Sequence, residues 1–143
     1  MKKILIINGP NLNLLGNRED DIYGKDSLDK IKSDCEKKGI EKKLEIIFFQ
    51  SNNEGEIIDK LHWAMDNQIE GIIINPGAFT HYSYAIRDAI SSIEIPTIEV
   101  HLSNIDNRES FRKVSVIKEV CIEQIKGKGK HGYLEAIEVI CKH

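Results

Sequence analysis

The chain has 143 residues, a length that fits one domain able to bury about two thirds of the surface that its unfolded form exposes. Its 20 lysine and arginine residues are outnumbered by 23 aspartate and glutamate residues, so its net charge of -3 offers no basic excess to attract nucleic acid or an anionic membrane. The apolar start of the chain is interrupted at Asn8, short of a signal-peptide core, and no run of about eighteen apolar residues follows. We therefore expect a soluble protein without nucleic-acid or membrane partners.

Five short apolar runs, rich in isoleucine and valine, predict strands that are buried on both faces, as in a parallel sheet. The runs cover residues 3–7, 44–49, 71–75, 97–101 and 120–125.

Helical patterns lie between these runs. The first follows Leu28, Ile31 and Cys35 and is expected to end at Gly39, because a glycine after a cationic turn is typical of a helix C-terminus. The other three apolar stripes are Ile57, Ile58, Leu61, Ala64 and Met65; Tyr82, Ile86, Ala89 and Ile93, stopped by Pro96; and Tyr133, Ala136, Ile137 and Ile140.

Strands that alternate with helices predict right-handed βαβ units in an α/β fold. For five strands the commonest order is 2-1-3-4-5, a flavodoxin-like, doubly wound, five-stranded parallel sheet with helices on both faces. We expect residues 1–143 to form a single domain. The ligand crevice of this fold opens where strands 1 and 3 end, and the sequence places Asn8 and Asn75 there.

Glu99 and His101 are two residues apart on the predicted fourth strand, so their side chains lie on the same face. A carboxylate beside an imidazole can fix its tautomer and favour its protonated form, which is the arrangement of an acid catalyst. A surface pair on an exposed strand end is the alternative. A second alternative is a metal site with His81 as a third ligand, but the sequence supports it less, because these residues lack a recognisable zinc spacing.

Residues 74–90 lead from the third strand into a helix, and we expect its cap at Thr80 or a close neighbour. Free N–H groups at such a helix start would face the crevice and attract carboxylates or phosphates. His81 in this turn either binds a substrate hydroxyl or supports the cap.

The segment between Gly9 and Gly24 has no periodicity and is long for a compact domain, which suggests an active-site lid. It contains Tyr23, and a phenol gives up its proton only near about pH 10 unless a cation favours the phenolate. Arg18 in the same segment could supply that charge, although a packing role for Tyr23 is the alternative.

Several other features have plainer interpretations. GKGKHG (127–132) matches a dinucleotide-binding pattern, but too little chain follows it, so we read it as a tight turn. Lys126, Lys128 and Lys130 are typical of a solvated connection. His62 and His143 are expected to be structural or solvated.

The cysteines Cys35, Cys121 and Cys141 are odd in number and lack a CxxC pair, which is typical of reduced, buried residues in a cytoplasmic protein.

Six longer stretches together closely resemble type II 3-dehydroquinate dehydratase, also called type II dehydroquinase. They are INGPNLNLLG (7–16), REDDIYG (18–24), FFQSNNEGEIID (48–59), INPGAFTHYS (74–83), IPTIEVHLSN (95–104) and ESFRKVS (109–115). The resemblance implies a flavodoxin-like fold and the anti elimination of water from 3-dehydroquinate to 3-dehydroshikimate through an enolate. This reaction belongs to the shikimate pathway of aromatic amino acid biosynthesis and needs no metal, cofactor or Schiff base.

The resemblance also implies residue roles. Tyr23 matches the base that removes the C2 proton, with Arg18 favouring its phenolate form. His101 matches the acid that protonates the departing C1 hydroxyl and is oriented by Glu99. Asn11 matches the asparagine that helps to hold a water against the enolate oxygen.

For substrate binding, the resemblance implies the side chains of Asn75, His81 and Arg112 and the backbone N–H groups of Leu102 and Ser103. Members of the family are typically dodecamers, built as a tetramer of trimers, and Asp88 matches a residue that reaches a neighbouring subunit's site.

The chain departs from the family pattern after Arg112, where Lys113 and Val114 replace two histidines, and at Asn53. A flavodoxin-like module that binds a flavin or a nucleotide is the alternative function, although the loop after the first strand lacks the hydroxyls that a flavin phosphate would favour.

Overall fold

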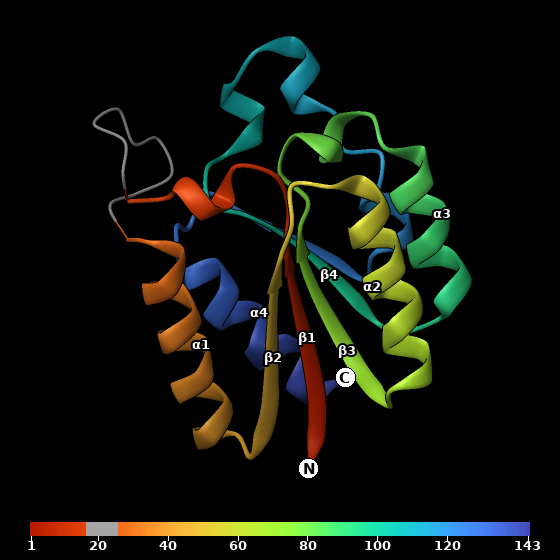
Figure 1. Cartoon of the computed structure of the whole chain (residues 1–143). Coiled ribbons are helices and arrows are strands. Elements are labelled where there is room, and N and C mark those ends of the chain that lie inside the picture. The colour runs from red at the N-terminus through yellow and green to blue at the C-terminus, as the bar shows by residue number, and fades with distance from the viewer. Residues whose placement is uncertain (17–25) are drawn as a thin grey trace.

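A sheet of five parallel strands lies at the centre of the molecule (Figure 1). The computed structural model describes residues 1–16 and 26–143. The strands are β1 (Lys2–Asn8), β2 (Leu44–Gln50), β3 (Ile69–Asn75), β4 (Thr97–His101) and β5 (Glu123–Lys126). Their order is β2-β1-β3-β4-β5 with every neighbouring pair parallel, which confirms the predicted doubly wound sheet.

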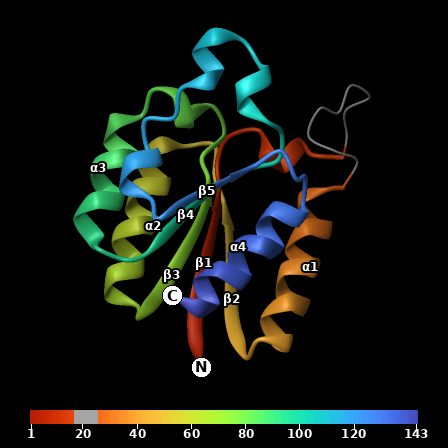
Figure 2. The same cartoon turned by 180° about the vertical axis from the view of Figure 1, so that it is seen from behind.

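Two pairs of helices cover the two faces of the sheet. The helices are α1 (Leu28–Glu41), α2 (Glu54–Asp66), α3 (Tyr84–Ile93) and α4 (His131–Lys142). Figure 1 and Figure 2 show, from opposite sides, α1 beside α4 on one face and α2 beside α3 on the other.

The central strand β1 contributes to both hydrophobic cores. Ile4 and Ile6 pack into the core under α1 and α4, whereas Leu5 and Ile7 pack into the core under α2 and α3. All four side chains are buried, and burying such a side chain contributes about 1.5–3 kcal/mol. This two-sided burial explains why β1, and likewise β3 and β4, read as unbroken apolar runs in the sequence. The edge strands β2 and β5 are only partly buried, so the prediction of burial on both faces is wrong for them.

The end of α1 differs from the prediction. Gly39 lies inside the helix rather than after its end, and Lys43, two residues beyond Glu41, takes the left-handed conformation with φ 59°. Gly39 is needed for close packing, because a Cβ atom at this position would lie 2.5 Å from Cγ1 of Ile46 on β2. The glycine therefore marks a helix–sheet contact, not a helix stop.

The start of α3 also differs. The N-cap is Ser83, whose hydroxyl accepts a hydrogen bond from the N–H of Ile86 at 3.1 Å, while Thr80 lies within a preceding 3-10 helix, Gly77–His81. Tyr82, expected on the buried stripe, precedes the helix and is exposed. The short 3-10 helix places Gly77 and Ala78, rather than the first turn of α3, at the edge of the sheet.

Two smaller differences occur elsewhere. Residues 120–122 do not belong to β5, although the N–H of Ile122 already bonds to the carbonyl of Thr97 at 2.8 Å and leads the chain into the edge strand. Met65 of α2 is exposed, so the buried stripe of this helix consists of Ile57, Leu61 and Ala64.

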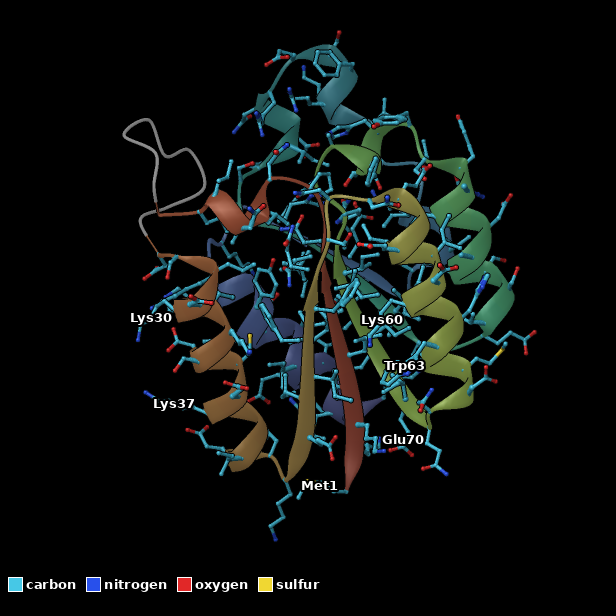
Figure 3. All side chains as sticks on the ribbon, viewed as in Figure 1. Met1, Lys30, Lys37, Lys60, Trp63 and Glu70 are labelled. Atoms are coloured by element: carbon cyan, nitrogen blue, oxygen red, sulfur yellow. The ribbon has the colours of Figure 1, made fainter. Side chains whose placement is uncertain are left out.

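The carboxyl ends of the strands meet at one edge of the sheet, as expected for a parallel arrangement. The segments that follow β1, β3 and β4 form 3-10 helices: Leu12–Leu14, Gly77–His81, Ile105–Asn107 and Ser110–Lys113. The opposite edge carries Met1 and Glu70, labelled in Figure 3. Among the described residues no helix is long and apolar enough to cross a membrane.

Candidate active site

A cavity of about 300 Å³ opens at the carboxyl edge of the sheet. The ends of β3 and β4 and the segments after β1, β3 and β4 supply its walls, as the topology predicts. It brings together many of the residues that the sequence singled out. Those that line it are Asn11, Asn75, His81, His101, Leu102, Ser103 and Arg112.

Two backbone segments meet at the base of this cavity. The N–H of Gly9 donates to the carbonyl of Asn75 at 2.8 Å, which joins the ends of β1 and β3. A Cβ atom at Gly9 would lie 2.3 Å from the carbonyl oxygen of Pro76, so no larger residue fits without moving the backbone. The sequence stretches that follow β1 and β3 are therefore packed directly against each other.

Asn11 is held at the mouth of the cavity in a left-handed conformation with φ 70°. Asparagine tolerates this region better than most residues do. The side-chain oxygen of Asn52 accepts a hydrogen bond from the N–H of Asn11 at 3.0 Å, and Gln50 donates to the carbonyl of Gly9 at 3.1 Å. The segment after β2 thus fixes the backbone of the segment after β1.

Glu99 and His101 form the ion pair that the spacing on β4 predicts. His101 Nε2 donates to Glu99 Oε2 in a very short contact, and both side chains are buried. The alternative of a surface pair on an exposed strand end is therefore wrong. Because Nε2 is occupied by the carboxylate, Nδ1 is the ring nitrogen of His101 that remains to exchange a proton with a ligand.

Two further side chains hold the carboxylate in place. Ser115 Oγ and Gln124 Nε2 donate to the same oxygen, Glu99 Oε2, at 2.8 and 3.0 Å. Burial acts to raise the pKa of Glu99, but the hydrogen bond and charge of His101, together with these two donors, hold the pKa below its ordinary value. Glu99 is accordingly an ionised group that orients His101.

His81 faces the cavity with a defined tautomer. Its Nδ1 lies 2.7 Å from the carbonyl of Val114, so Nδ1 carries the hydrogen and neutral Nε2 can accept one. Burial lowers the pKa of His81, and the nearby charges of His101 and Arg112 act in the same direction. The side chain bonds to Val114 and not to the cap of α3, which favours an acceptor for a ligand hydroxyl over support of the cap.

The backbone of Leu102 and Ser103 is fixed by the glycine-rich turn after β5. Gly129 N–H donates to the Leu102 carbonyl at 3.0 Å, and Gly127 N–H donates to the Ser103 carbonyl at 3.1 Å. Gly127 has φ 77°, a conformation that residues with a Cβ rarely adopt. GKGKHG is therefore a turn, as predicted, and it also supports one wall of the cavity.

Two arginines from the segment after β4 contribute positive charge to the cavity wall. Arg112 lines the cavity, its Nε lies 3.3 Å from Glu109 Oε2, and its guanidinium lies 4.8 Å from the centre of the Phe111 ring. Arg108 also lines the cavity, although the sequence reasoning missed it. Its position four residues before Arg112, in the same polar segment, was the available signal.

The structure leaves three predicted residues outside this cavity. Asp88 is exposed on α3 and is not part of the lining. Tyr23 and Arg18 lie outside the described residues, so their predicted roles stay predictions.

The remaining features fit the plainer interpretations. Each lysine of the basic run contacts a carboxylate: Lys126 pairs with Asp106, Lys128 with Glu135, and Lys130 with Asp34. The outer histidines, His62 and His143, are exposed.

All three cysteines are free thiols, and burial raises the pKa of Cys35 and of Cys121 to about 12. Cys35 is buried, whereas Cys121 and Cys141 are partly buried. Within residues 1–16 and 26–143, no group of three metal-ligating side chains is placed to hold an ion.

Comparison with known proteins agrees with this geometry. The family described as Dehydroquinase class II matches residues 2–141. A 3-dehydroquinate dehydratase of Caldicellulosiruptor saccharolyticus is 61% identical over 137 residues, which cover 96% of this chain and 94% of that protein. The crystal structure of a type II dehydroquinase from Butyrivibrio crossotus superposes with a TM-score of 0.95 at 51% identity and covers 97% of each chain. A cavity with a buried glutamate–histidine pair thus occurs in a chain that belongs to the class II dehydroquinase family.

Proposed function

We propose that this chain eliminates water from 3-dehydroquinate to give 3-dehydroshikimate through an enolate, and that residues 1–143 form one catalytic domain. Membership of the class II dehydroquinases and relatives named 3-dehydroquinate dehydratase support the reaction. The structural observation that carries the proposal is the buried ion pair of Glu99 and His101 at the wall of a cavity lined by polar side chains.

In this proposal, His101 is the acid that protonates the C1 hydroxyl as it leaves. Its Nε2 is held by Glu99, and Nδ1 is the atom that transfers the proton. The ionised carboxylate stabilises the imidazolium before the transfer and fixes the ring orientation, and both effects favour the role of His101 as a general acid.

Tyr23 is the proposed base that removes the C2 proton, with Arg18 favouring its phenolate. Both residues lie outside the described part of the chain, and the proposal rests on the match of REDDIYG to the family pattern. Leu15, a few residues earlier, lines the cavity, which supports a role for this segment in the site. A proton next to a ketone can be removed when the resulting oxyanion is stabilised, and we assign that task to a water held by Asn11.

The cavity offers complementary groups for the polar substituents of the substrate. We propose that His81 Nε2 accepts from a substrate hydroxyl, and that Asn75 and Arg112 bind the remaining hydroxyls and the carboxylate. The backbone N–H groups of Leu102 and Ser103 complete the carboxylate site. The fixed carbonyl of Leu102 supports the assignment of Ser103, because this carbonyl and the Ser103 N–H belong to the same planar peptide group.

We also propose that the chain assembles as a dodecamer, a tetramer of trimers, in which Asp88 reaches a neighbouring subunit's site. Exposed apolar side chains near the cavity support an interface there: Tyr82, Tyr84, Phe111 and Val114 are all more than half exposed in the isolated chain. Light scattering of the purified protein tests this, and a monomer would refute it. A cytoplasmic location stays a prediction from the cysteine pattern.

A direct assay tests the reaction. Purified protein mixed with 3-dehydroquinate should produce the ultraviolet absorbance of a conjugated enone, and Tyr23→Phe should abolish it while leaving the fold intact. Borohydride added with substrate should not inactivate the protein, because no imine forms. Turnover by Tyr23→Phe close to that of the unaltered protein would show that the base is misassigned, and an unaltered protein without turnover would refute the function.

A further inference from the structure

A chain of hydrogen bonds runs beneath the cavity from α4 to the ends of β1 and β3. Tyr133 Oη lies 2.5 Å from Asn8 Oδ1 and 3.1 Å from Asn75 Nδ2. All three side chains are buried. Asn75 lines the cavity, whereas Asn8 and Tyr133 do not.

Backbone groups at both ends fix the direction of every bond in this chain. At one end, Asn8 Nδ2 donates to the carbonyl of Phe49 at 3.1 Å; a carbonyl can only accept, so Asn8 must present Oδ1 to the tyrosine. At the other end, the N–H of Gly77 can only donate, at 3.2 Å, so Asn75 must present Oδ1 to Gly77 and Nδ2 to the tyrosine.

Among the three side chains of this hydrogen-bond chain, the tyrosine is the one whose single polar atom, the hydroxyl oxygen, can both donate and accept. It donates to Asn8 Oδ1 and accepts from Asn75 Nδ2. The hydroxyl therefore links the oxygen of one amide to the nitrogen of the other and couples their orientations. Burial raises the pKa of Tyr133, which keeps the hydroxyl protonated and able to donate.

We propose that Tyr133 is a positioning residue that acts through Asn75. Its hydroxyl holds the Asn75 amide in one orientation, and one Nδ2 hydrogen is left to donate to an acceptor oxygen on the substrate in the cavity. A phenylalanine would fill the same space, but the Asn75 amide would then keep its bond from the Gly77 N–H at Oδ1 and lose the tyrosine at Nδ2, so its orientation would be fixed less tightly.

This inference rests on the proposed function, so its test separates the two. Tyr133→Phe should lower kcat/KM for 3-dehydroquinate about five- to twentyfold, mainly through KM, because the effect acts on a binding group. In an Asn75→Ala background the same substitution should change kcat/KM less than twofold, since the residue through which it acts is gone.

Asn8→Ala provides a second route to the same result, should Tyr133→Phe fold poorly. Asn8 does not line the cavity, and its side-chain oxygen is linked to Asn75 through the tyrosine hydroxyl. Its other side-chain hydrogen bond goes to the Phe49 carbonyl on β2, and an effect through that bond should persist in the Asn75→Ala chain. Asn8→Ala should raise KM in the chain with Asn75 and leave KM unchanged in the Asn75→Ala chain. Thr97→Val is the matched control. Thr97 is buried, its hydroxyl donates to the Ile95 carbonyl over a distance of 2.9 Å, and it does not line the cavity. Loss of this hydrogen bond should lower Tm without raising KM.

A measurement without substrate completes the test. In the free protein, one Nδ2 hydrogen of Asn75 should be protected from exchange with water in nitrogen-15 NMR spectra, and the protection should disappear in Tyr133→Phe. Three outcomes would each overturn the proposal. The first is a KM that stays within twofold in both Tyr133→Phe and Asn8→Ala. The second is an equal loss of kcat/KM on Tyr133→Phe in the Asn75→Ala background, and the third is an unprotected Asn75 amide in the unaltered protein. An unaltered protein with the protected amide but without turnover would refute the function and leave the hydrogen-bond chain established.

Discussion

Replacing Glu99 by glutamine removes a charge from the site while keeping its shape. His101, Ser115 and Gln124 all donate to Oε2, and the carbonyl oxygen of a glutamine could accept the same three hydrogen bonds. In the described part of the chain Oε1 has no hydrogen-bond partner, so an amide nitrogen in its place would face no competing donor but would also find no acceptor. The substitution therefore removes the negative charge beside His101 with little change of shape, and the unpaired amide should appear as a loss of Tm.

The size of the effect follows from the kind of hydrogen bond that is lost. A bond to a charged group contributes about 1.5–3 kcal/mol, and a bond between neutral groups contributes about 0.5–1.5 kcal/mol. The difference of about 1–1.5 kcal/mol is stabilisation that the imidazolium loses, and about 1.4 kcal/mol corresponds to a tenfold change. We expect kcat at neutral pH to fall about tenfold.

Steady-state assays of Glu99→Gln from about pH 5 to 10, with circular dichroism to verify the fold, measure this effect. Glu70→Gln is the control, because Glu70 is exposed at the opposite edge of the sheet (Figure 3) and its replacement should alter neither kcat nor the pH profile. A kcat of Glu99→Gln within twofold of that of the unaltered protein would show that the carboxylate does not act on the acid, and would refute the reasoning.

Three further predictions concern the same site. His101→Ala should lower the free energy of unfolding by about 1–3 kcal/mol near pH 7, because it removes a partner of the buried Glu99, and chemical denaturation should show this cost shrinking as the pH falls. The sign follows from the lowered pKa of Glu99. The contacts of its ionised carboxylate stabilise the fold fully above the ordinary pKa of 4.5 and are lost as acid protonates the carboxylate. A loss of unfolding free energy in His101→Ala that grows toward low pH would contradict this account. Gly9→Ala should lower Tm by several degrees and abolish turnover, since its methyl group would meet the Pro76 carbonyl, and a variant with unchanged Tm would refute that contact. Gly127→Ala should raise KM more than it lowers kcat, because it strains the turn that fixes Ser103, and an unchanged KM would show that the turn does not support substrate binding.

The parts of the fold that the sequence predicted are those with a strong period. Apolar runs located the strands, and their alternation with helices predicted the order of the sheet. The expected burial on both faces holds for the inner strands β1, β3 and β4, but the edge strands β2 and β5 are only partly buried. The spacing of Glu99 and His101 predicted their contact because side chains two apart on a strand share a face.

The sequence was misleading where a residue serves a contact far away in the chain. Gly39 resembled a helix stop, but it allows α1 to approach Ile46, and nothing local distinguishes the two uses of glycine. Tyr133 belonged to a regular apolar stripe, and its hydroxyl became meaningful only when the fold placed it beside Asn8 and Asn75. Such tertiary partners leave no periodic signal in a single sequence.

The central claim is that His101 supplies the proton that allows the C1 hydroxyl to leave, while another group removes the C2 proton. The measurement that tests it most directly follows 3-dehydroquinate by proton NMR in deuterium oxide with His101→Asn, after binding of the substrate to this variant has been verified by calorimetry. We expect the C2 hydrogen to exchange with solvent deuterium while no 3-dehydroshikimate forms. Elimination of water at a rate within tenfold of the unaltered protein would contradict the account.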